Sequence, residues 1–312
     1  MKQINKLYKL YFNLPGFTKY GIAGKAVDRA LELAMVYYFE YSMPGRLKKE
    51  LEKLDNGLYE GVPREEKYII SLTSFPARID RIWITITTLL MQSFKPDKIV
   101  LWLANEQFPN KELPESLVAL TEKGLEIRFC EDLRSHKKYY YTMIENPDTN
   151  VITVDDDVYY PEYMLSELVQ QHKKFPEAVC ANFAHKILFE DGRIKKYMQW
   201  KHKHKAIKTP SHKLMQVGVG GVLYPPKVLY EKVFNKELFK EVSPKSDDVW
   251  LKTMSYLNNT KIVTSPYFNK QLVTVRGSQE KSLNSVNSHK GLKDIQIKNV
   301  IDHFNINVSN VE

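Results

Sequence analysis

Cysteine is scarce in this chain, and long apolar runs are missing from it. Its 312 residues contain two cysteines, Cys130 and Cys180, each within an apolar, strand-like stretch. Two cysteines cannot form the disulfide framework of a secreted domain, so we expect buried thiols in a reducing, cytoplasmic compartment. No apolar run reaches the roughly 18 residues of a membrane-spanning helix. Residues 1–20 also lack the uninterrupted apolar core of a secretory signal.

The signatures of nucleic-acid-binding proteins are missing as well, although the chain is basic. Its formal net charge of +9 suits nucleic acid, anionic lipid or phosphorylated small molecules. The sequence shows no zinc-ligand spacing, no heptad repeat and no RNA-binding aromatic motif, so we expect no nucleic-acid partner. The length is that of one large domain, or of one domain with an extension.

From residue 67 onward, strand-like and helix-like stretches alternate. Strands are predicted at 67–73, 98–104, 125–130, 151–154, 178–184, 261–264 and 272–275, and helices at 79–94, 113–123, 137–145, 162–175 and 294–304. This alternation predicts an α/β protein with a mostly parallel sheet flanked by helices. Ligands of such sheets bind in the loops that follow the strands.

The stretch Asn150–Pro161, NVITVDDDVYYP, carries the strongest chemical signal. The β-branched run Val151–Val154 predicts a buried strand, and it leads directly into Asp155, Asp156 and Asp157. Carboxylates this close repel one another, and burying them is unfavourable unless they are paired or bound to a metal. In extended chain the first and third share a face, which suits Mg²⁺ or Mn²⁺ carrying a diphosphate. The alternative is an acidic turn with solvated carboxylates.

The segment VDDDVYYP resembles the DxD segment of GT-A glycosyltransferases. Residues 68–109, YIISLTSFPARIDRIWITITTLLMQSFKPDKIVLWLANEQFP, are similar to the opening of bacterial polysaccharide glycosyltransferases of that fold. The resemblance covers roughly residues 67–299. It implies a GT-A, Rossmann-like fold that moves a sugar from a nucleotide-sugar donor, expected to be uridine-based, to a hydroxyl of a glycan or lipid-linked glycan acceptor. It also implies Mn²⁺ or Mg²⁺ as cofactor.

The same resemblance suggests roles for the three acids of the triplet. It places Asp157 on the divalent cation and Asp155 on the metal or the ribose, with Asp155 and Asp156 among the residues that bind the nucleotide sugar. It also offers His289, in the segment SHKGLK, as a third metal ligand. The alternative for that segment is a capped surface helix.

The loops after the first and third predicted strands contain further candidates for binding the nucleotide. Thr73, Ser74 and Arg78 form a hydroxyl-rich turn with an arginine beside a helix start, which suits a diphosphate. Alternatively, the hydroxyls cap a helix and the arginine lies on the surface. After the third strand, the resemblance implies Asp132 at the base or ribose and Lys138 at a phosphate. The alternative there is a salt-bridged surface loop.

Two later segments complete the predicted site. In Val217–Pro226, VGVGGVLYPP, glycines within a strand-like stretch mark a bulge or the close approach of a ligand. The resemblance places Gly220 and Gly221 at the donor sugar. Ser246 or Asp247 can cap a helix predicted to begin near Asp248, and acids are favoured at such a helix start. The resemblance offers the two acids instead to the acceptor hydroxyl, with Asp248 ahead of Asp247 as general base.

Residues 1–60 are predicted to form a basic helical arm before a catalytic domain at 61–312. Residues 1–25 contain five lysines and no acid, interleaved with aromatic residues. A helix is predicted at 26–41, ended by Pro44 and Gly45, with a second helix at 46–54. Basic residues beside exposed aromatics suit peripheral contact with an anionic membrane on the cytoplasmic face. The alternative is an arm packed on the catalytic domain with solvated lysines.

Two other classes of protein fit parts of this pattern. Another metal-dependent phosphoryl-transfer enzyme, either a nucleotidyltransferase or a phosphatase, would also use the aspartate triplet. An aspartyl phosphatase normally carries its nucleophile after the first strand, where this chain has Thr73 and Ser74. The third class is a non-catalytic glycan-binding module with a degenerate site.

Overall fold

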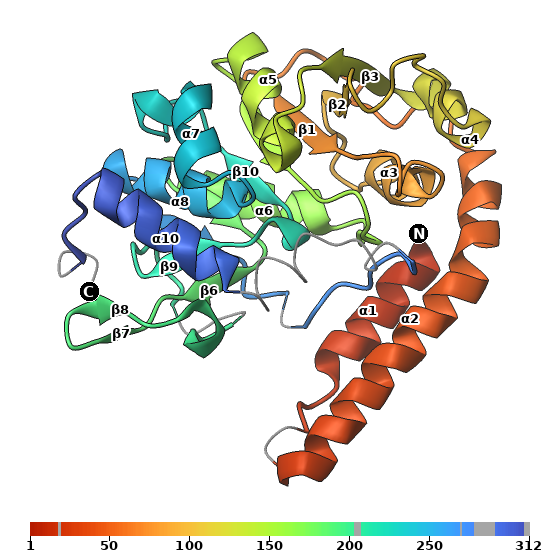
Figure 1. The fold of residues 1–312 in the computed structure, drawn as a ribbon. Helices are drawn as coiled ribbons and strands as arrows, with labels where there is room; N and C mark the ends of the chain where they lie inside the picture. Colours follow the sequence, from red (N-terminus) through yellow and green to blue (C-terminus); the bar gives the residue numbers. More distant parts are fainter. Residues whose placement is uncertain (18–19, 203–206, 269, 278–290, 309–312) are drawn as a thin grey trace.

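A seven-stranded sheet lies at the centre of the computed structural model, which describes residues 1–17, 20–202, 207–268, 270–277 and 291–308 (Figure 1). The strands lie in the order β11-β5-β10-β4-β1-β2-β3. They are β1 (Tyr68–Thr73), β2 (Lys98–Ala104), β3 (Leu125–Cys130), β4 (Asn150–Thr153), β5 (Val179–Ala181), β10 (Val222–Tyr224) and β11 (Ile262–Thr264). Strand β10 is antiparallel to both neighbours, and the other pairs of this sheet are parallel. The predicted mostly parallel α/β sheet is confirmed.

Helices cover both faces of the sheet, and each face has its own apolar core. One face is covered by α1 (Lys2–Asn13), α2 (Gly21–Leu51), α3 (Ile82–Leu90), α4 (Glu115–Val118) and α6 (Met164–Lys174). The other is covered by α5 (Lys137–Glu145), α7 (Lys236–Val242), α8 (Asp247–Leu257) and α10 (Leu292–His303). Alternation along β10 serves both cores, because Leu223 packs into the first and its neighbours Val222 and Tyr224 into the second.

Outside the main sheet, the described residues form four short strands. Strand β6 (Ala184–Lys186) pairs with β9 (Leu214–Gln216), and β7 (Phe189–Glu190) pairs with β8 (Arg193–Ile194). Asp191 and Gly192 connect the second pair, and both have positive φ, as the predicted hairpin turn requires.

The order of strands reverses between β1 and β4. Going along the chain, β2 and β3 are added on one side of β1, whereas β4 pairs with its other side. The carboxyl ends of β1 and β4 therefore lie side by side, with Ser71 in register with Thr153. This is the switch point at which open α/β sheets bind their ligands. The loop that begins at Ser74 and the aspartate triplet both start there.

Helix α1 packs behind the segment that follows the triplet. The hydroxyl of Tyr8 donates a hydrogen bond to the carbonyl oxygen of Tyr159, at 2.7 Å, and accepts one from the backbone nitrogen of Val273, at 2.8 Å. Tyr8, Ile4 and Phe12 are buried in the core of this face of the sheet. Helix α1 is therefore continuous with the core of the chain, while the division at residue 60 stays a prediction.

The predicted helix break at Pro44 and the predicted strand at 272–275 are both wrong. Helix α2 runs unbroken from Gly21 to Leu51 with Pro44 inside it. Its buried side chains Phe39, Met43 and Leu47 share one face at four-residue spacing, and their packing outweighs the local cost of the proline. The strand predicted at 272–275 is only a single bridge between Thr274 and Val158.

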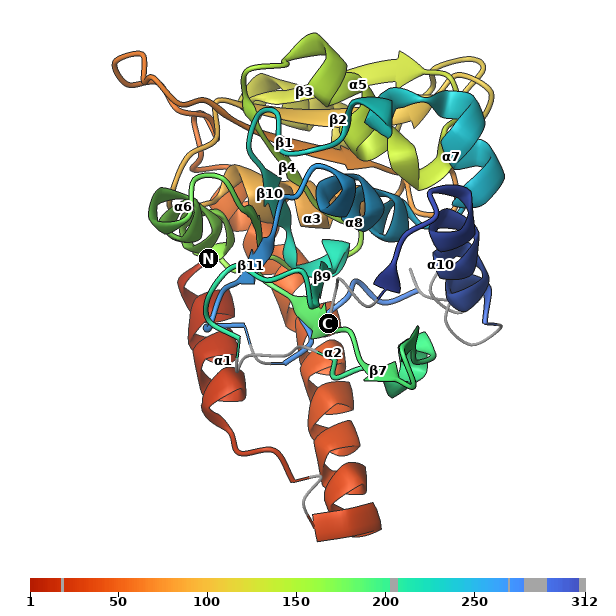
Figure 2. The same ribbon diagram turned by 90° about the vertical axis from the view of Figure 1, so that its left-hand side faces the viewer.

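Helices α1 and α2 form a helical hairpin (described residues 1–17 and 20–51) that projects from the rest of the molecule (Figures 1 and 2). At its tip, the backbone nitrogen of Phe17 donates to both carboxylate oxygens of Asp28, at 3.1 and 3.0 Å. A Cβ on Gly24 would lie 1.7 Å from the Phe17 carbonyl oxygen, so only glycine permits this close approach. Within the described residues, no helix has the length and apolarity needed to span a bilayer.

Candidate active site

The loops after β1 and β4 are joined by ion pairs. Asp156 is buried; it accepts a hydrogen bond from the Ser74 hydroxyl at 2.5 Å and pairs with Arg78. The same guanidinium lies 3.1 Å from Asp157. Three predicted nucleotide-site residues, Ser74, Arg78 and Asp156, thus form one cluster. Thr73 lies beside them at the end of β1, and its hydroxyl donates to the carbonyl of Trp102.

Lys138 links the triplet to the second acidic segment. This buried lysine enters the site from α5, and its ammonium lies 3.1 Å from Asp155 and 2.8 Å from Asp247. Burial lowers its pKa, but the carboxylates of Asp155, Asp247 and Asp248 outweigh that effect and raise the pKa well above its usual value. Lys138 is therefore a permanent cation among acids that come from two distant parts of the sequence.

Asp248 is an acid whose charged form is disfavoured by its surroundings. Ser246 caps α8 by accepting a hydrogen bond from the backbone of Val249, so Asp247 and Asp248 fall in the first turn of the helix. Burial, and next the charge of Asp247, raise the pKa of Asp248 to about 6. Its Oδ1 accepts a hydrogen bond from the Gly218 backbone at 3.2 Å. A carboxylate with a pKa near neutrality can take up a proton during a reaction.

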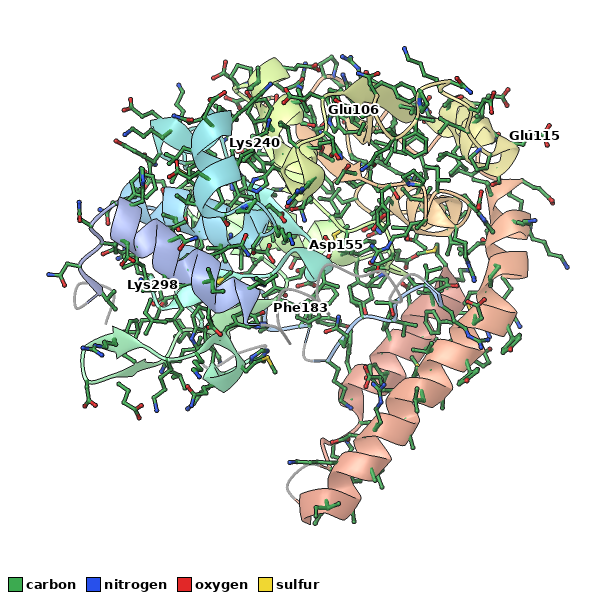
Figure 3. The ribbon with its side chains drawn as sticks, in the orientation of Figure 1. Glu106, Glu115, Asp155, Phe183, Lys240 and Lys298 are labelled. Atoms are coloured by element: carbon green, nitrogen blue, oxygen red, sulfur yellow. The ribbon has the colours of Figure 1, made fainter. Side chains whose placement is uncertain are left out.

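Gly218 marks the point where the two acidic segments meet. A Cβ at this position would lie 3.0 Å from Lys138 Nζ, 3.3 Å from Asp155 Oδ1 and 3.4 Å from Asp248 Oδ1. The distance between Asp155 Oδ1 and Asp248 Oδ1 therefore cannot exceed the sum of their distances from this Cβ position. Asp155 lies near the middle of the molecule (Figure 3). Two acids and a cation therefore converge on the position that a side chain at residue 218 would occupy.

Tyr160 holds the glycine segment against the triplet. Its buried hydroxyl accepts a hydrogen bond from the backbone nitrogen of Asp155, at 3.0 Å, and donates one to the carbonyl of Val219, at 3.2 Å. One side chain thus contacts both the glycine segment and the backbone of Asp155. Tyr160 belongs to the segment NVITVDDDVYYP, but nothing in the sequence pattern predicts that its hydroxyl contacts both segments.

Lys293 is a second cation of the site that sequence reasoning missed. It is buried in α10 with its ammonium 4.4 Å from the ring centre of Tyr197. Burial lowers the pKa of Lys293, but interactions with Tyr197, Asp248 and Asp247 outweigh that effect, so the pKa is raised above its usual value. In the sequence it is one lysine of a basic carboxyl-terminal stretch, so no local signal distinguished it.

The remaining predicted residues lie elsewhere or outside the described chain. Gly220 and Gly221 face the core: added Cβ atoms would lie 2.4 Å from the Phe183 ring and 2.9 Å from the Met164 sulfur. Asp132 pairs with Lys137 and accepts a hydrogen bond from Gln107 at 3.0 Å. The contact of these three predicted residues with a donor stays a prediction, as does the role of His289, which falls outside the described residues.

The donor set of the cluster fits a divalent cation that arrives with a diphosphate. Its carboxylates outnumber its cationic side chains, and carboxylate oxygen is the preferred ligand of Mg²⁺ and Mn²⁺. The side chain of Asp155 is 33% exposed, against 7% for Asp157. The described residues contain no group of three His, Cys, Asp or Glu side chains poised around one point. Mg²⁺ held with phosphates uses one or two carboxylates, so two suffice.

Fold and site together define an α/β protein with an acidic, lysine-bridged site at its switch point. No protein-family model matches the sequence, and the curated proteins contain no significant match. Among solved structures, a mannosyltransferase from Pyrobaculum calidifontis, in complex with GDP-Man and Mn²⁺, aligns at a TM-score of 0.47 and 9% identity, covering 89% of this chain and 74% of that one.

Two further solved structures are similar over much of their length. A 4-diphosphocytidyl-2C-methyl-D-erythritol synthase aligns at a TM-score of 0.40 and 11% identity, covering 67% of this chain and 93% of that one. The inositol-1-phosphate CTP transferase from T. maritima aligns at 0.39 and 12% identity, covering 77% and 98%.

Proposed function

We propose that this chain is a metal-dependent glycosyltransferase that moves a sugar from a nucleotide-sugar donor, expected to be a UDP-sugar, to a hydroxyl of a glycan or lipid-linked glycan. The observation that carries this proposal is the convergence of Asp155, Asp248 and Lys138 around Gly218. A donor with a negatively charged diphosphate needs a cation beside it, and an acceptor hydroxyl needs a base. This site offers both at the switch point of the sheet.

In this proposal, each described residue of the site has a separate role in sugar transfer. Lys138 and Arg78 are the cations that face the diphosphate, and Gly218 lets the donor approach the backbone closely. Asp248, with its pKa of about 6, accepts the proton of the acceptor hydroxyl. The bond between the anomeric carbon and the diphosphate oxygen breaks, and a bond to the acceptor oxygen forms. The nucleoside diphosphate leaves with the electron pair.

Asp155 and Asp157 are the side chains proposed to hold Mn²⁺ or Mg²⁺. When bound, such an ion neutralises the charge that develops on the departing diphosphate. Asp155 needs little rearrangement because it is partly open, whereas Asp157 must share its contact with Arg78. Asp156 is assigned to positioning, since each of its two oxygens already has a partner, Ser74 for one and Arg78 for the other.

A panel of nucleotide sugars tests the proposal. The full-length chain is incubated with each donor and Mn²⁺, and the thermal midpoint and the slow hydrolysis of the donor are recorded. We expect one or a few uridine-based donors to raise the midpoint and to release UDP, and Asp248→Asn to slow release without abolishing the midpoint shift. Turnover of a nucleoside triphosphate to pyrophosphate without sugar transfer would reassign the chain as a nucleotidyltransferase. No nucleotide-dependent shift would reject an enzyme of either class.

A further inference from the structure

Helix α2 exposes an apolar surface that no described part of the chain covers. Its buried residues are Gly24, at the tip of the helical hairpin, and then Phe39, Met43 and Leu47, so none lies between residues 25 and 38. Five exposed, uncharged residues follow one another at alternating spacings of three and four: Ala23, Ala26, Ala30, Leu33 and Tyr37. Ile22 is 89% exposed at the amino-terminal end of the same surface.

Helix α1 is different, because its apolar residues are used inside the molecule. Ile4, Tyr8 and Phe12 lie in the core, so these side chains are not available to an external partner. The opposite side of α1 presents Lys2, Lys6 and Lys9, all exposed. No Asp or Glu occurs in the sequence before Asp28. The helical hairpin thus combines an exposed apolar surface on one helix with a row of exposed lysines on the other.

We infer that the helical hairpin docks on an anionic lipid bilayer, with the tip and apolar face of α2 in the headgroup region and the α1 lysines on lipid phosphates. Apolar insertion and electrostatic attraction together are what a peripheral membrane helix requires. Charge complementarity favours this occupant over a second copy, since two copies would bring the same lysines toward one another. The hydrogen bonds of Phe17 to Asp28 and the close packing at Gly24 hold the tip in shape before it meets the surface.

This inference does not depend on the proposed reaction, so vesicle binding and sugar transfer are separate readouts. The full-length chain is sedimented with vesicles of phosphatidylcholine alone and of phosphatidylcholine containing about 30% phosphatidylglycerol. Two variants remove the two components: Ile22→Glu with Val27→Glu, and Lys2→Gln with Lys6→Gln and Lys9→Gln. Val27 is 44% exposed, and the three lysines are exposed, so these variants are expected to fold.

Matched controls change exposed residues outside the helical hairpin. Val118→Glu, at a side chain 46% exposed on α4, controls for adding an acid at an apolar surface site. Lys227→Gln with Lys240→Gln and Lys298→Gln controls for net charge; Lys240 and Lys298 lie across the domain from the helical hairpin (Figure 3). All variants should keep the wild-type thermal midpoint.

We expect binding to anionic vesicles, little binding to phosphatidylcholine alone, and at least a tenfold weaker partition coefficient for each hairpin variant, with the controls near wild type. Each lysine near an anionic surface contributes about a fivefold factor, so the triple lysine variant can lose more. Equal binding of wild type and Ile22→Glu with Val27→Glu would overturn the inference. So would a dimer in light scattering that this same variant dissociates, because the surface would then belong to a second copy.

Discussion

The ammonium of Lys138 lies 2.8 Å from the carboxylate of Asp247, although 109 positions in the chain separate the two residues. Both side chains are nearly buried, and Asp155 contacts the same ammonium from another segment. Because the two groups are buried, each charge is tolerated only beside the other. Removing either one leaves an uncompensated charge in the protein interior.

Lys138→Met is therefore expected to lower the free energy of unfolding by about 3–5 kcal/mol at pH 7, measured by urea denaturation. Adding Asp247→Asn should restore part of that loss, because the neutral amide leaves one fewer unpaired charge. Lys236→Met is the matched control, since Lys236 pairs with Glu131 at a more exposed site and its removal should cost about 1 kcal/mol or less. A Lys138 variant no less stable than the Lys236 variant would contradict the pairing.

Asp155 and Asp156 are expected to differ in what their substitution removes. Asp155→Asn should weaken Mn²⁺-dependent binding of UDP at least tenfold, with a small change in thermal midpoint, because this carboxylate is partly open. Asp156→Asn should instead cost about 1–3 kcal/mol of stability, since the amide keeps one acceptor oxygen where Ser74 and Arg78 use two. Calorimetric titration and urea denaturation separate the effects. The reverse outcome would move the metal to Asp156.

Two glycines of one segment give a matched pair of substitutions. Gly218→Ala places a methyl group 3.0 Å from Lys138 Nζ, in the space proposed for the donor, so donor affinity should fall while stability changes little. Gly220→Ala brings a methyl group within 2.4 Å of the Phe183 ring and should cost about 1–3 kcal/mol by overpacking. A donor titration and a urea denaturation curve are measured for each variant. Unchanged donor affinity in the Gly218 variant would remove that glycine from the site.

The rate of sugar transfer should fall as pH drops through about 6, because Asp248 accepts a proton only when ionised. The neighbouring charges predict opposite shifts of this acid limb. Asp247→Asn removes a negative charge that raises the pKa of Asp248, so its limb should move to lower pH. Lys293→Met removes a positive charge that lowers that pKa, so its limb should move to higher pH. Profiles of kcat/KM against pH measure both, and shifts in the same direction would exclude Asp248 as the titrating group.

Much of the sheet and part of the site could be predicted because their signals are local. The alternation of strands and helices, the acids after β4 and the Ser246 cap each depend on a few adjacent residues. The meeting of Ser74 and Arg78 with the triplet followed from the rule that parallel strands end at one edge. Local spacing and one topological rule were sufficient there.

The convergence at Gly218 could not be predicted in the same way. It arises because β10 enters the sheet antiparallel between β4 and β5, which brings the glycine segment against Asp155. No local pattern specifies that insertion. Lys293 depends similarly on how α10 packs, and the unbroken course of α2 through Pro44 depends on tertiary contacts that outweigh local propensity.

The hydroxyl of Tyr8 sits between Tyr159 and Val273 and satisfies a polar backbone group on each. A shortened chain that begins after the helical hairpin would leave a cavity beside the residues that follow the aspartates. The Tyr159 carbonyl and the Val273 backbone N–H would then lose this hydrogen-bond partner. If such a fragment were inactive or insoluble, the result would reflect the loss of helix α1 from the core and would not test the catalytic residues. Biochemical trials should therefore start from residue 1, with any purification tag at the other end.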